Sequence, residues 1–168
     1  NSLDPYPNIQ LYFNPLTYSV SYKNKRPLLK TDKFNGFIIG FNSCRPKSLG
    51  EVKLRVFKDD YLPSINPNYL SDERDIHDLY STFDFIRKFS ANKNINNIIK
   101  APVNIDPINA NDDELLDHFK SSSTTIYHPS GTCRMSKDIS TGVVSDKLKV
   151  HGLDNLWIVD ASIMPNIT

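Results

Sequence analysis

Two short stretches near the end of the chain hold residues whose types and spacing could perform chemistry. The first reads Tyr-His-Pro-Ser-Gly-Thr-Cys-Arg-Met over residues 127–135. Pro129 restricts the backbone of His128 to extended conformations, and Gly131 permits a tight turn after it. An imidazole held in this way can accept a proton near neutral pH, as the oxidation of an alcohol to a carbonyl requires. His128 is therefore a candidate catalytic residue, although a lone histidine is more often structural, and it is the surrounding motif that favours the catalytic role.

The second stretch reads Leu-Trp-Ile-Val-Asp-Ala-Ser-Ile-Met-Pro over residues 156–165. It predicts an apolar strand that ends at Asp160, where a carboxylate and exposed backbone groups can contact a ligand. Taken alone, Asp160 is more simply explained as a strand-ending residue that caps the following turn. The pairing of the two stretches is what favours a binding role.

In this order and at this separation, the two stretches resemble the C-terminal signature of the glucose–methanol–choline (GMC) family of flavin oxidoreductases. The likeness is closest to the choline dehydrogenase and alcohol dehydrogenase-like members. Two upstream stretches are also similar to family patterns: Arg-Pro-Lys-Ser-Leu-Gly-Glu-Val at 45–52, and Ile-Asn-Pro-Asn-Tyr-Leu-Ser-Asp at 65–72. The resemblance thus runs from about residue 40 to the end of the chain.

The resemblance implies roles for three residues and one cofactor, FAD. His128 matches the histidine that lies over the flavin as base or hydrogen-bonding partner during hydride transfer. Asp160 and Ala161 match the residues that touch the ribityl–pyrophosphate region of FAD. The implied reaction is oxidation of the CH–OH group of choline or a similar alcohol. The chain departs from the family at Ser136 and over residues 143–146, which affects local loop geometry.

Composition excludes several other classes of function. A formal net charge of +1 over 168 residues gives no basic footprint for nucleic acid, and no apolar run reaches the roughly 20 residues of a membrane span. Cys44 and Cys133 suggest neither a disulfide framework nor a metal site. We expect no metal and a reducing, cytoplasmic location, with peripheral membrane association left open.

The chain begins at Asn1 and contains no Gly-x-Gly-x-x-Gly stretch, so we expect it to be part of a longer enzyme. Its expected partners are a missing N-terminal FAD-binding domain and a small alcohol substrate. The isolated chain should be inactive and without FAD. The family's second catalytic Asn or His would lie beyond Thr168. The exposed C-terminal strand is a candidate site of association with another copy.

The periodicity predicts an α+β fold, with an antiparallel sheet covered by helices and a C-terminal segment that completes the missing FAD-binding domain. Residues 1–125 would form the substrate-binding domain, and 126–168 the active-site loop and strand returning to the FAD-binding domain. Apolar alternation predicts strands at 9–13, 16–20, 36–41 and 51–56. The last of these should turn its Val and Leu side chains to the core. The basic stretch that includes Lys23, Lys25, Arg26, Lys30 and Lys33 is predicted as a solvated loop.

Two helices are predicted next. One covers about residues 72–90, with Ser71 as N-cap and an aromatic stripe packed on the sheet, and a shorter one begins at Asn111, with Glu114 completing a capping box. His77 and His118 on these helices are expected at the surface, and His151 is expected to be structural. Two other functions remain open: a flavin-free binding or scaffold module, and a flavin-containing cyanohydrin lyase of the same fold.

Overall fold

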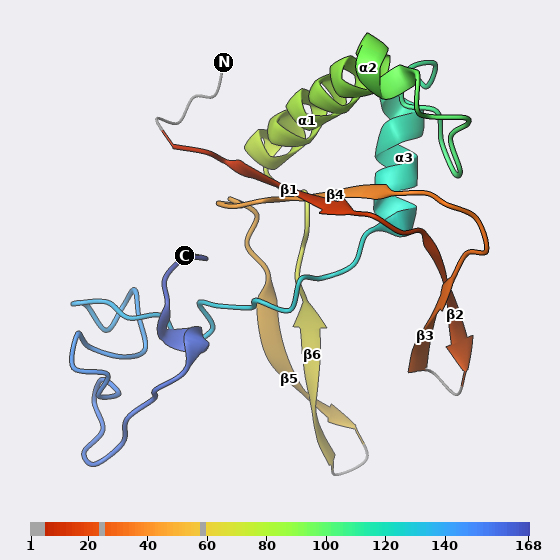
Figure 1. The fold of residues 1–168 in the computed structure, drawn as a ribbon. Helices are drawn as coiled ribbons and strands as arrows, with labels where there is room; N and C mark the ends of the chain where they lie inside the picture. The colour runs from red at the N-terminus through yellow and green to blue at the C-terminus, as the bar shows by residue number, and fades with distance from the viewer. Residues whose placement is uncertain (1–5, 24–25, 58–59) are drawn as a thin grey trace. The chain divides into compact units, whose positions relative to one another are not determined.

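The structure is a computed structural model that describes residues 6–23, 26–57 and 60–168 (Figure 1). Antiparallel strands and helices make up its regular structure, which confirms the predicted α+β class. The strands are β1 (Ile9–Asn14), β2 (Tyr18–Lys23), β3 (Arg26–Thr31), β4 (Ile38–Ser43), β5 (Glu51–Phe57) and β6 (Asp60–Asn66). The helices are α1 (Glu73–Ala91), α2 (Lys93–Asn96), α3 (Asp112–Ser122) and the 3₁₀ turn η1 (Ala161–Ile163).

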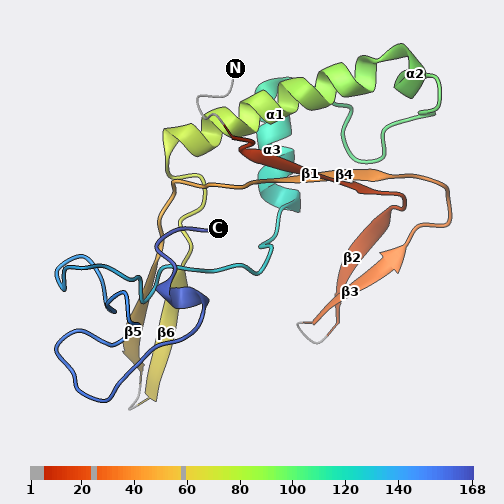
Figure 2. The same cartoon turned by 60° about the vertical axis from the view of Figure 1, so that its left-hand side comes forward.

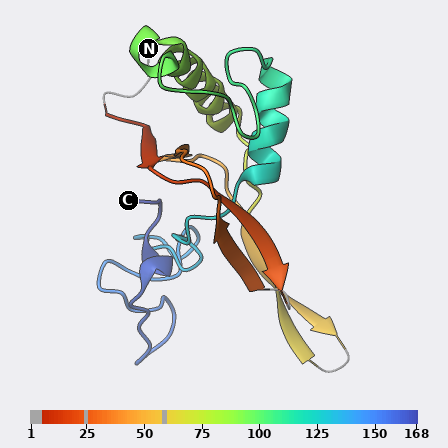
Figure 3. The same cartoon turned by 45° about the vertical axis from the view of Figure 1, so that its right-hand side comes forward.

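Within the described residues, the strands pair as three separate two-stranded ladders, β1–β4, β2–β3 and β5–β6 (Figure 3). The predicted loop over the basic stretch is wrong, because β3 pairs with β2 along its length, from Tyr18 opposite Thr31 to Lys23 opposite Arg26. Lysines are tolerated on strands with an open edge, so their number misled the prediction. Lys25 lies outside the described residues. β6 was not predicted either; it contains Pro63, a residue that sheets accept at their edges.

The chain divides into two compact units, Asn1–Cys44 and Arg45–Thr168. In the first unit, the backbone N–H of Asp32 donates to the carbonyl of buried Thr17 at 3.0 Å. The ring of Phe13 on β1 lies 5.2 Å from that of Phe37, which directly precedes β4. The predicted domain division at residue 125 concerns a longer protein and stays a prediction.

Helices α1 and α3 of the second unit pack through apolar side chains. Leu79, Phe83 and Leu115 are buried, and the ring of Phe83 meets that of Phe119 edge to face at 6.5 Å. Sequence analysis expected the aromatic stripe of α1 to pack on the sheet. The ring contact between Phe83 and Phe119 is instead with α3. Among the described residues, no helix is both long and apolar enough to cross a membrane, and the cytoplasmic location stays a prediction.

Both helices begin at carboxylate or amide caps. The predicted capping box of α3 is confirmed: Asn111 accepts from the Glu114 N–H, and the Glu114 carboxylate accepts from the Asn111 N–H, each at 2.9 Å. The N-cap of α1 is Asp72 and not Ser71, because the Asp72 side chain accepts from the Arg74 N–H at 2.9 Å. In each helix the cap side chain thereby accepts from a backbone N–H of the first turn that has no partner within the helix.

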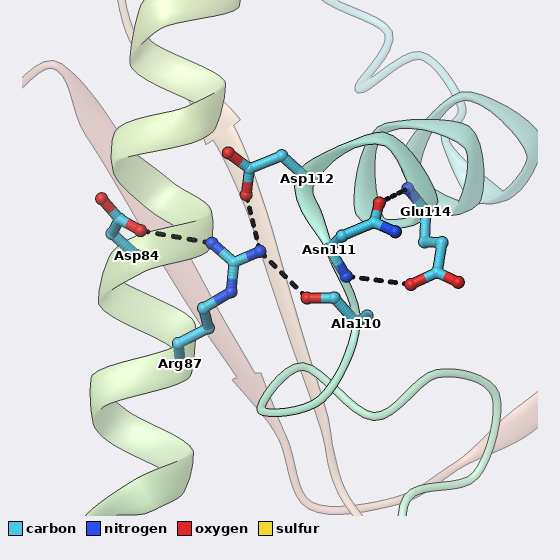
Figure 4. A network of polar contacts seen from close by, with 6 residues as sticks. All are labelled: Asp84, Arg87, Ala110, Asn111, Asp112 and Glu114. Atoms are coloured by element: carbon cyan, nitrogen blue, oxygen red, sulfur yellow. Dashed lines mark hydrogen bonds and ion pairs between the residues drawn. The ribbon is translucent and has the colours of Figure 1, made fainter.

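A network around Arg87 joins α1 to the start of α3 (Figure 4). Its guanidinium donates to the Asp112 carboxylate at 2.6 Å, to the Ala110 carbonyl at 3.1 Å and to Asp84 at 3.2 Å. The hydrogen bond to Asp112 is the main reason that the pKa of Arg87 is raised above its ordinary value. The network fixes the position at which α3 starts. It thereby also positions the chain that follows α3.

The β5–β6 ladder corrects a second prediction. Val52, Leu54 and Val56 were expected to face a core, yet they are 51%, 75% and 70% exposed. Their cross-strand partners are Ile65, Pro63 and Tyr61, so one face of the ladder is apolar and solvent-exposed. Alternation identifies which side chains share a face, but it does not show that this chain contains the surface that would cover them.

The base of this ladder is attached to α1 by a buried carboxylate. Asp75 accepts from the backbone N–H groups of Lys47 and Ser48, each at 2.8 Å, and from the Ser48 hydroxyl at 2.5 Å. The same hydroxyl oxygen accepts from the N–H groups of Ser71 and Asp72, at 3.0 and 3.1 Å. The stretch at 45–52 that carries the family resemblance is therefore fixed directly to the start of the long helix.

Candidate active site

The loop that carries His128 leaves α3 after Ser122 (Figure 2). His128 is exposed, and Tyr127 before it has a left-handed backbone with φ of 61°. Such a conformation is unusual for a bulky residue. The hydroxyl oxygen of Thr125 accepts a hydrogen bond from the Tyr127 N–H at 3.0 Å. After His128 the backbone turns again at Gly131, with φ of 86°. Left-handed turns thus lie on both sides of the histidine.

The structure brings the two candidate stretches together, although sequence analysis gave no direct contact between them. The Cys133 N–H donates to the Ser162 carbonyl at 2.9 Å, and the Met135 N–H donates to the Ile163 carbonyl at 2.8 Å. The chain at Gly131 is also close, since a Cβ added there would lie 3.5 Å from the Met164 carbonyl oxygen. Backbone hydrogen bonds therefore join the segment after His128 to the segment after Asp160.

We call the network of backbone hydrogen bonds over residues 133–163 the C-terminal ladder. Beyond its contact with 162–163, segment 133–136 bonds to 143–144, through the Val143 N–H to Arg134 carbonyl bond at 2.8 Å. Segment 143–145 in turn bonds to 149–151, and the Val150 N–H donates to the Leu156 carbonyl at 3.0 Å. Val144 lies in the middle with 0% exposure. Short extended pieces around one buried valine thus position both motifs.

Gly142 explains how closely the C-terminal ladder packs. A Cβ on Gly142 would lie 2.5 Å from the Cβ of Ser136 and 2.8 Å from the Arg134 carbonyl oxygen, a distance that real side chains do not adopt. The small residue lets the turn over 138–142 fold back on segment 134–136.

The predicted strand over residues 156–160 is replaced by a shorter contact. Trp157 forms an isolated antiparallel bridge with Lys149, and the Ile158 N–H donates to the Leu148 carbonyl at 3.1 Å. The segment has therefore folded back on its own chain along one edge. Trp157 and Val159 remain 52% and 75% exposed, and association with another copy through this segment stays a prediction.

Asp160 is the N-cap of η1. Its carboxylate accepts from the Ser162 N–H at 2.8 Å, and hydrogen bonds from the side chain and the backbone of Ser162 lower the pKa of Asp160. The carboxylate is thus anionic at neutral pH. The capping role considered from sequence is present, and both Asp160 and Ala161 are exposed. The N–H of Ala161 has no hydrogen-bond partner among the described residues, so one free donor stands beside one carboxylate.

The remaining histidines have other surroundings. His151 Nε2 lies 2.9 Å from the Ser136 carbonyl oxygen, which confirms its structural role in the C-terminal ladder. His118 Nδ1 lies 3.3 Å from the Ser122 hydroxyl, and His77 is exposed beside Asp78. Cys133 is a free thiol whose backbone joins the C-terminal ladder. Of the four histidines, His128 alone lies on the loop next to the Asp160 turn.

A family model described as GMC oxidoreductase matches residues 46–168. The chain belongs to the GMC oxidoreductase family. The resemblance seen in the sequence is therefore confirmed. Ser136, where the GMC pattern usually has glycine, is accommodated: its N–H donates to the Val144 carbonyl at 2.9 Å, and its hydroxyl lies 2.6 Å from that of Thr141.

The GMC relatives include an alcohol dehydrogenase (acceptor) from Pseudomonas putida, 36% identical over 96% of this chain. An oxygen-dependent choline dehydrogenase from Burkholderia vietnamiensis is 33% identical over 98% of this chain. This chain spans 28% of the length of each. Among solved structures, pyridoxine 4-oxidase from Mesorbium loti is 27% identical with a TM-score of 0.68, over 96% of this chain and 30% of that protein.

A second solved structure is a formate oxidase from Aspergillus oryzae studied for its FAD modification. It is 30% identical with a TM-score of 0.68, over 82% of this chain and 24% of that protein.

Thr125 is a residue to which sequence analysis gave no role. The available signal was its position two residues before Tyr127, because Ser and Thr hydroxyls accept from the N–H two residues on.

Proposed function

We propose that this chain is the C-terminal part of an FAD-dependent GMC enzyme that oxidises the CH–OH group of an alcohol. The observation that carries the proposal is the pairing of the His128 loop with the Asp160 turn through the Cys133 and Met135 hydrogen bonds. The segment that directly follows the candidate base is thereby joined to the turn that carries the candidate cofactor contacts. The catalytic and cofactor-binding assignments below belong to this proposal.

The groups at the Asp160 turn fit one part of FAD. The carboxylate of Asp160 is an acceptor suited to a ribityl hydroxyl, and the free N–H of Ala161 is a donor suited to a phosphate oxygen. When bound, FAD supplies the acceptor for the hydride. Asp160 and Ala161 would contribute binding and orientation only, since neither belongs to the reacting groups.

His128 would act on the substrate hydroxyl. In the oxidation, the O–H bond breaks and its proton passes to an imidazole nitrogen, while the hydride leaves the carbon and a C=O double bond forms. The exposed ring of His128 has no hydrogen-bond partner among the described residues, so its nitrogens are available to a substrate. Pro129 and the flanking turns would hold the ring in place.

The rest of the cofactor site would come from a separate part of the same protein. This chain corresponds to 28% of the length of its relatives, and we propose that an N-terminal FAD-binding domain accounts for the difference. The isolated 168 residues would then be inactive and would not retain FAD. Choline and other small alcohols are the substrates suggested by the names of the relatives.

The deciding experiment is His128→Ala in the complete flavoprotein, with anaerobic flavin reduction by the alcohol as the measurement. Loss of a positioned acid–base group lowers the rate by roughly 10²–10⁴-fold. We expect the variant to stay folded and yellow and to be reduced more slowly by that factor. His77→Ala is the matched control, because His77 is exposed on α1, and it should stay within a few-fold of the parent.

Three other outcomes would contradict or replace the proposal. If the flavin of His128→Ala were reduced at the parental rate, the loop would be a structural element and His128 would have no catalytic role. A parent protein that binds FAD and releases cyanide from a cyanohydrin without reducing the flavin would be a lyase. A parent protein that binds no FAD at all would favour a scaffold or binding module.

A further inference from the structure

We propose that Thr125 is a positioning residue for His128, an inference that rests on the proposed function of that histidine. The hydroxyl of Thr125 accepts the hydrogen bond from the Tyr127 N–H at 3.0 Å. Thr125 would not touch the substrate. It would hold the turn that sets the direction in which the His128 ring leaves the backbone.

The argument begins with how few contacts hold this loop. α3 ends with the Ser123 N–H donating to the Phe119 carbonyl, and the C-terminal ladder begins with the Cys133 N–H donating to Ser162. Among the described residues, the Thr125–Tyr127 hydrogen bond is the only one formed by residues 124–132. Upstream of His128, the loop therefore depends on one side-chain hydroxyl.

The conformation that this hydroxyl supports is an uncommon one. Tyr127 has φ of 61°, and the residue is 74% exposed. A left-handed backbone is costly for an L-residue, and packing of the exposed ring does not offset that cost here. The hydrogen bond to Thr125 holds the peptide plane from which the Tyr127 φ rotation starts, and it is the described interaction that anchors this turn. Its removal should therefore loosen the turn and let Tyr127 leave this conformation.

A change at Tyr127 would move His128 directly. The two residues are adjacent, and Pro129 restricts the backbone of His128 to extended conformations. Because His128 cannot adjust freely, a rotation at Tyr127 would be passed on as a change in ring direction. Misplacement of a catalytic group by about 1 Å can lower a rate by up to about 10²-fold.

The neighbouring threonine provides a matched control. Thr124 is exposed like Thr125, but no hydrogen bond of its side chain is described. Thr125→Val removes the acceptor while keeping the shape of the side chain, and Thr125→Ser keeps the hydroxyl. Thr124→Val makes the same chemical change one residue away.

The experiment measures anaerobic flavin reduction at saturating alcohol in the complete flavoprotein, in the parental and in the His128→Ala background. We expect Thr125→Val to reduce the parental rate about 3- to 10-fold, the effect of one lost neutral hydrogen bond, with flavin content unchanged. Thr125→Ser should restore most of the rate, and Thr124→Val should not change it. In the His128→Ala background, Thr125→Val should have no further effect, because its action passes through His128.

A second readout is independent of catalysis. The backbone amide hydrogen of Tyr127 should exchange with solvent faster in Thr125→Val than in the parent and in Thr124→Val, while the amide of Cys133 keeps its protection. This measurement reports the hydrogen bond itself and needs no substrate.

The outcomes separate the two proposals. If His128→Ala leaves flavin reduction unchanged, the proposed function fails. If His128→Ala slows the reaction and Thr125→Val does not, the inference about Thr125 is wrong. It is equally wrong if Thr125→Val slows the reaction by the same factor with and without His128, because Thr125 would then act independently of the histidine.

Discussion

The two halves of the candidate site are held by different interactions. The loop over residues 124–132 has one described hydrogen bond and takes its shape from local backbone chemistry, with left-handed angles at Tyr127 and Gly131. The C-terminal ladder, residues 133–163, is joined by successive backbone hydrogen bonds around fully buried Val144. The candidate base lies in the first half, and the candidate FAD contacts lie in the second.

The difference matches the tasks that we propose for each half. A cofactor that stays bound requires a surface that keeps its shape, and a buried ladder provides one. A group that exchanges protons with substrate must be accessible, so it lies on an exposed loop whose direction is fixed by a few residues. Variants that affect one half and not the other test this comparison.

Val144→Ala should have the largest effect. Removing methyl groups from a fully buried valine loses apolar burial and leaves a cavity, a cost of roughly 2–3 kcal/mol. The measurement is native-state hydrogen exchange at the amides of Val150 and His151, which donate within the C-terminal ladder. Their free energy of opening should fall by that amount.

The control for this variant is Val143→Ala, because Val143 is 38% exposed and precedes Val144 directly. It should lower protection far less. The amide of Tyr127 should exchange at the parental rate in both variants. If Val144→Ala also exposed that amide, the loop and the C-terminal ladder would open as one unit, and the comparison would be wrong.

Gly131→Ala should have an intermediate effect that stays within the loop. A Cβ there would meet the Met164 carbonyl oxygen at an ordinary 3.5 Å, so the cost comes from φ of 86°, roughly 1–2 kcal/mol. Chemical shifts around His128 should change while the amides of Val150 and His151 keep their protection.

Gly152→Ala tests the same backbone cost in the other half. Gly152 has φ of 74°, and its added Cβ would meet only Ile139 Cδ1 at 3.7 Å. This substitution should lower the protection of the neighbouring His151 amide and leave the loop unchanged. If both glycine variants altered the same set of amides, the two halves would not be independent.

The sequence predicted the residues of the site better than it predicted their connection. The resemblance of the two motifs to the GMC family implied the roles of His128, Asp160 and Ala161, and these roles stay predictions. The backbone bonds that join Cys133 to Ser162 and Met135 to Ile163 were not predicted, because peptide groups are the same in every residue and leave no compositional signal. The predicted strand at 156–160 proved to be a single bridge at Trp157.

The fold shows the same limit. Side chains predicted the Asn111–Glu114 capping box of α3 correctly, because the signal and the structure are both local, whereas the N-cap of α1 lies at Asp72, one residue after the predicted Ser71. Apolar alternation correctly placed Val52, Leu54 and Val56 on one face of β5, but it could not show whether this chain would cover that face. Burial depends on residues distant in the chain, or on another domain.

The smallest predicted effect concerns pH at the end of the C-terminal ladder. Hydrogen bonds from the Ser162 side chain and backbone lower the pKa of Asp160 below its ordinary value of 3.8. A lowered pKa in the folded state means that the cap is fully present above the ordinary value and is lost as the pH falls through the lowered one. After correction for intrinsic exchange, protection of the Ser162 amide should therefore decrease below about pH 4. The Cys133 amide, which donates to the Ser162 carbonyl, should keep its protection, because that bond contains no titrating group.

Asp160→Asn is the matched control for this pH effect. Asparagine also caps helical turns but does not titrate, so protection of the Ser162 amide should become independent of pH in this range. Loss of protection at Cys133 together with Ser162 would show that the Asp160 cap holds the whole end of the C-terminal ladder and not η1 alone.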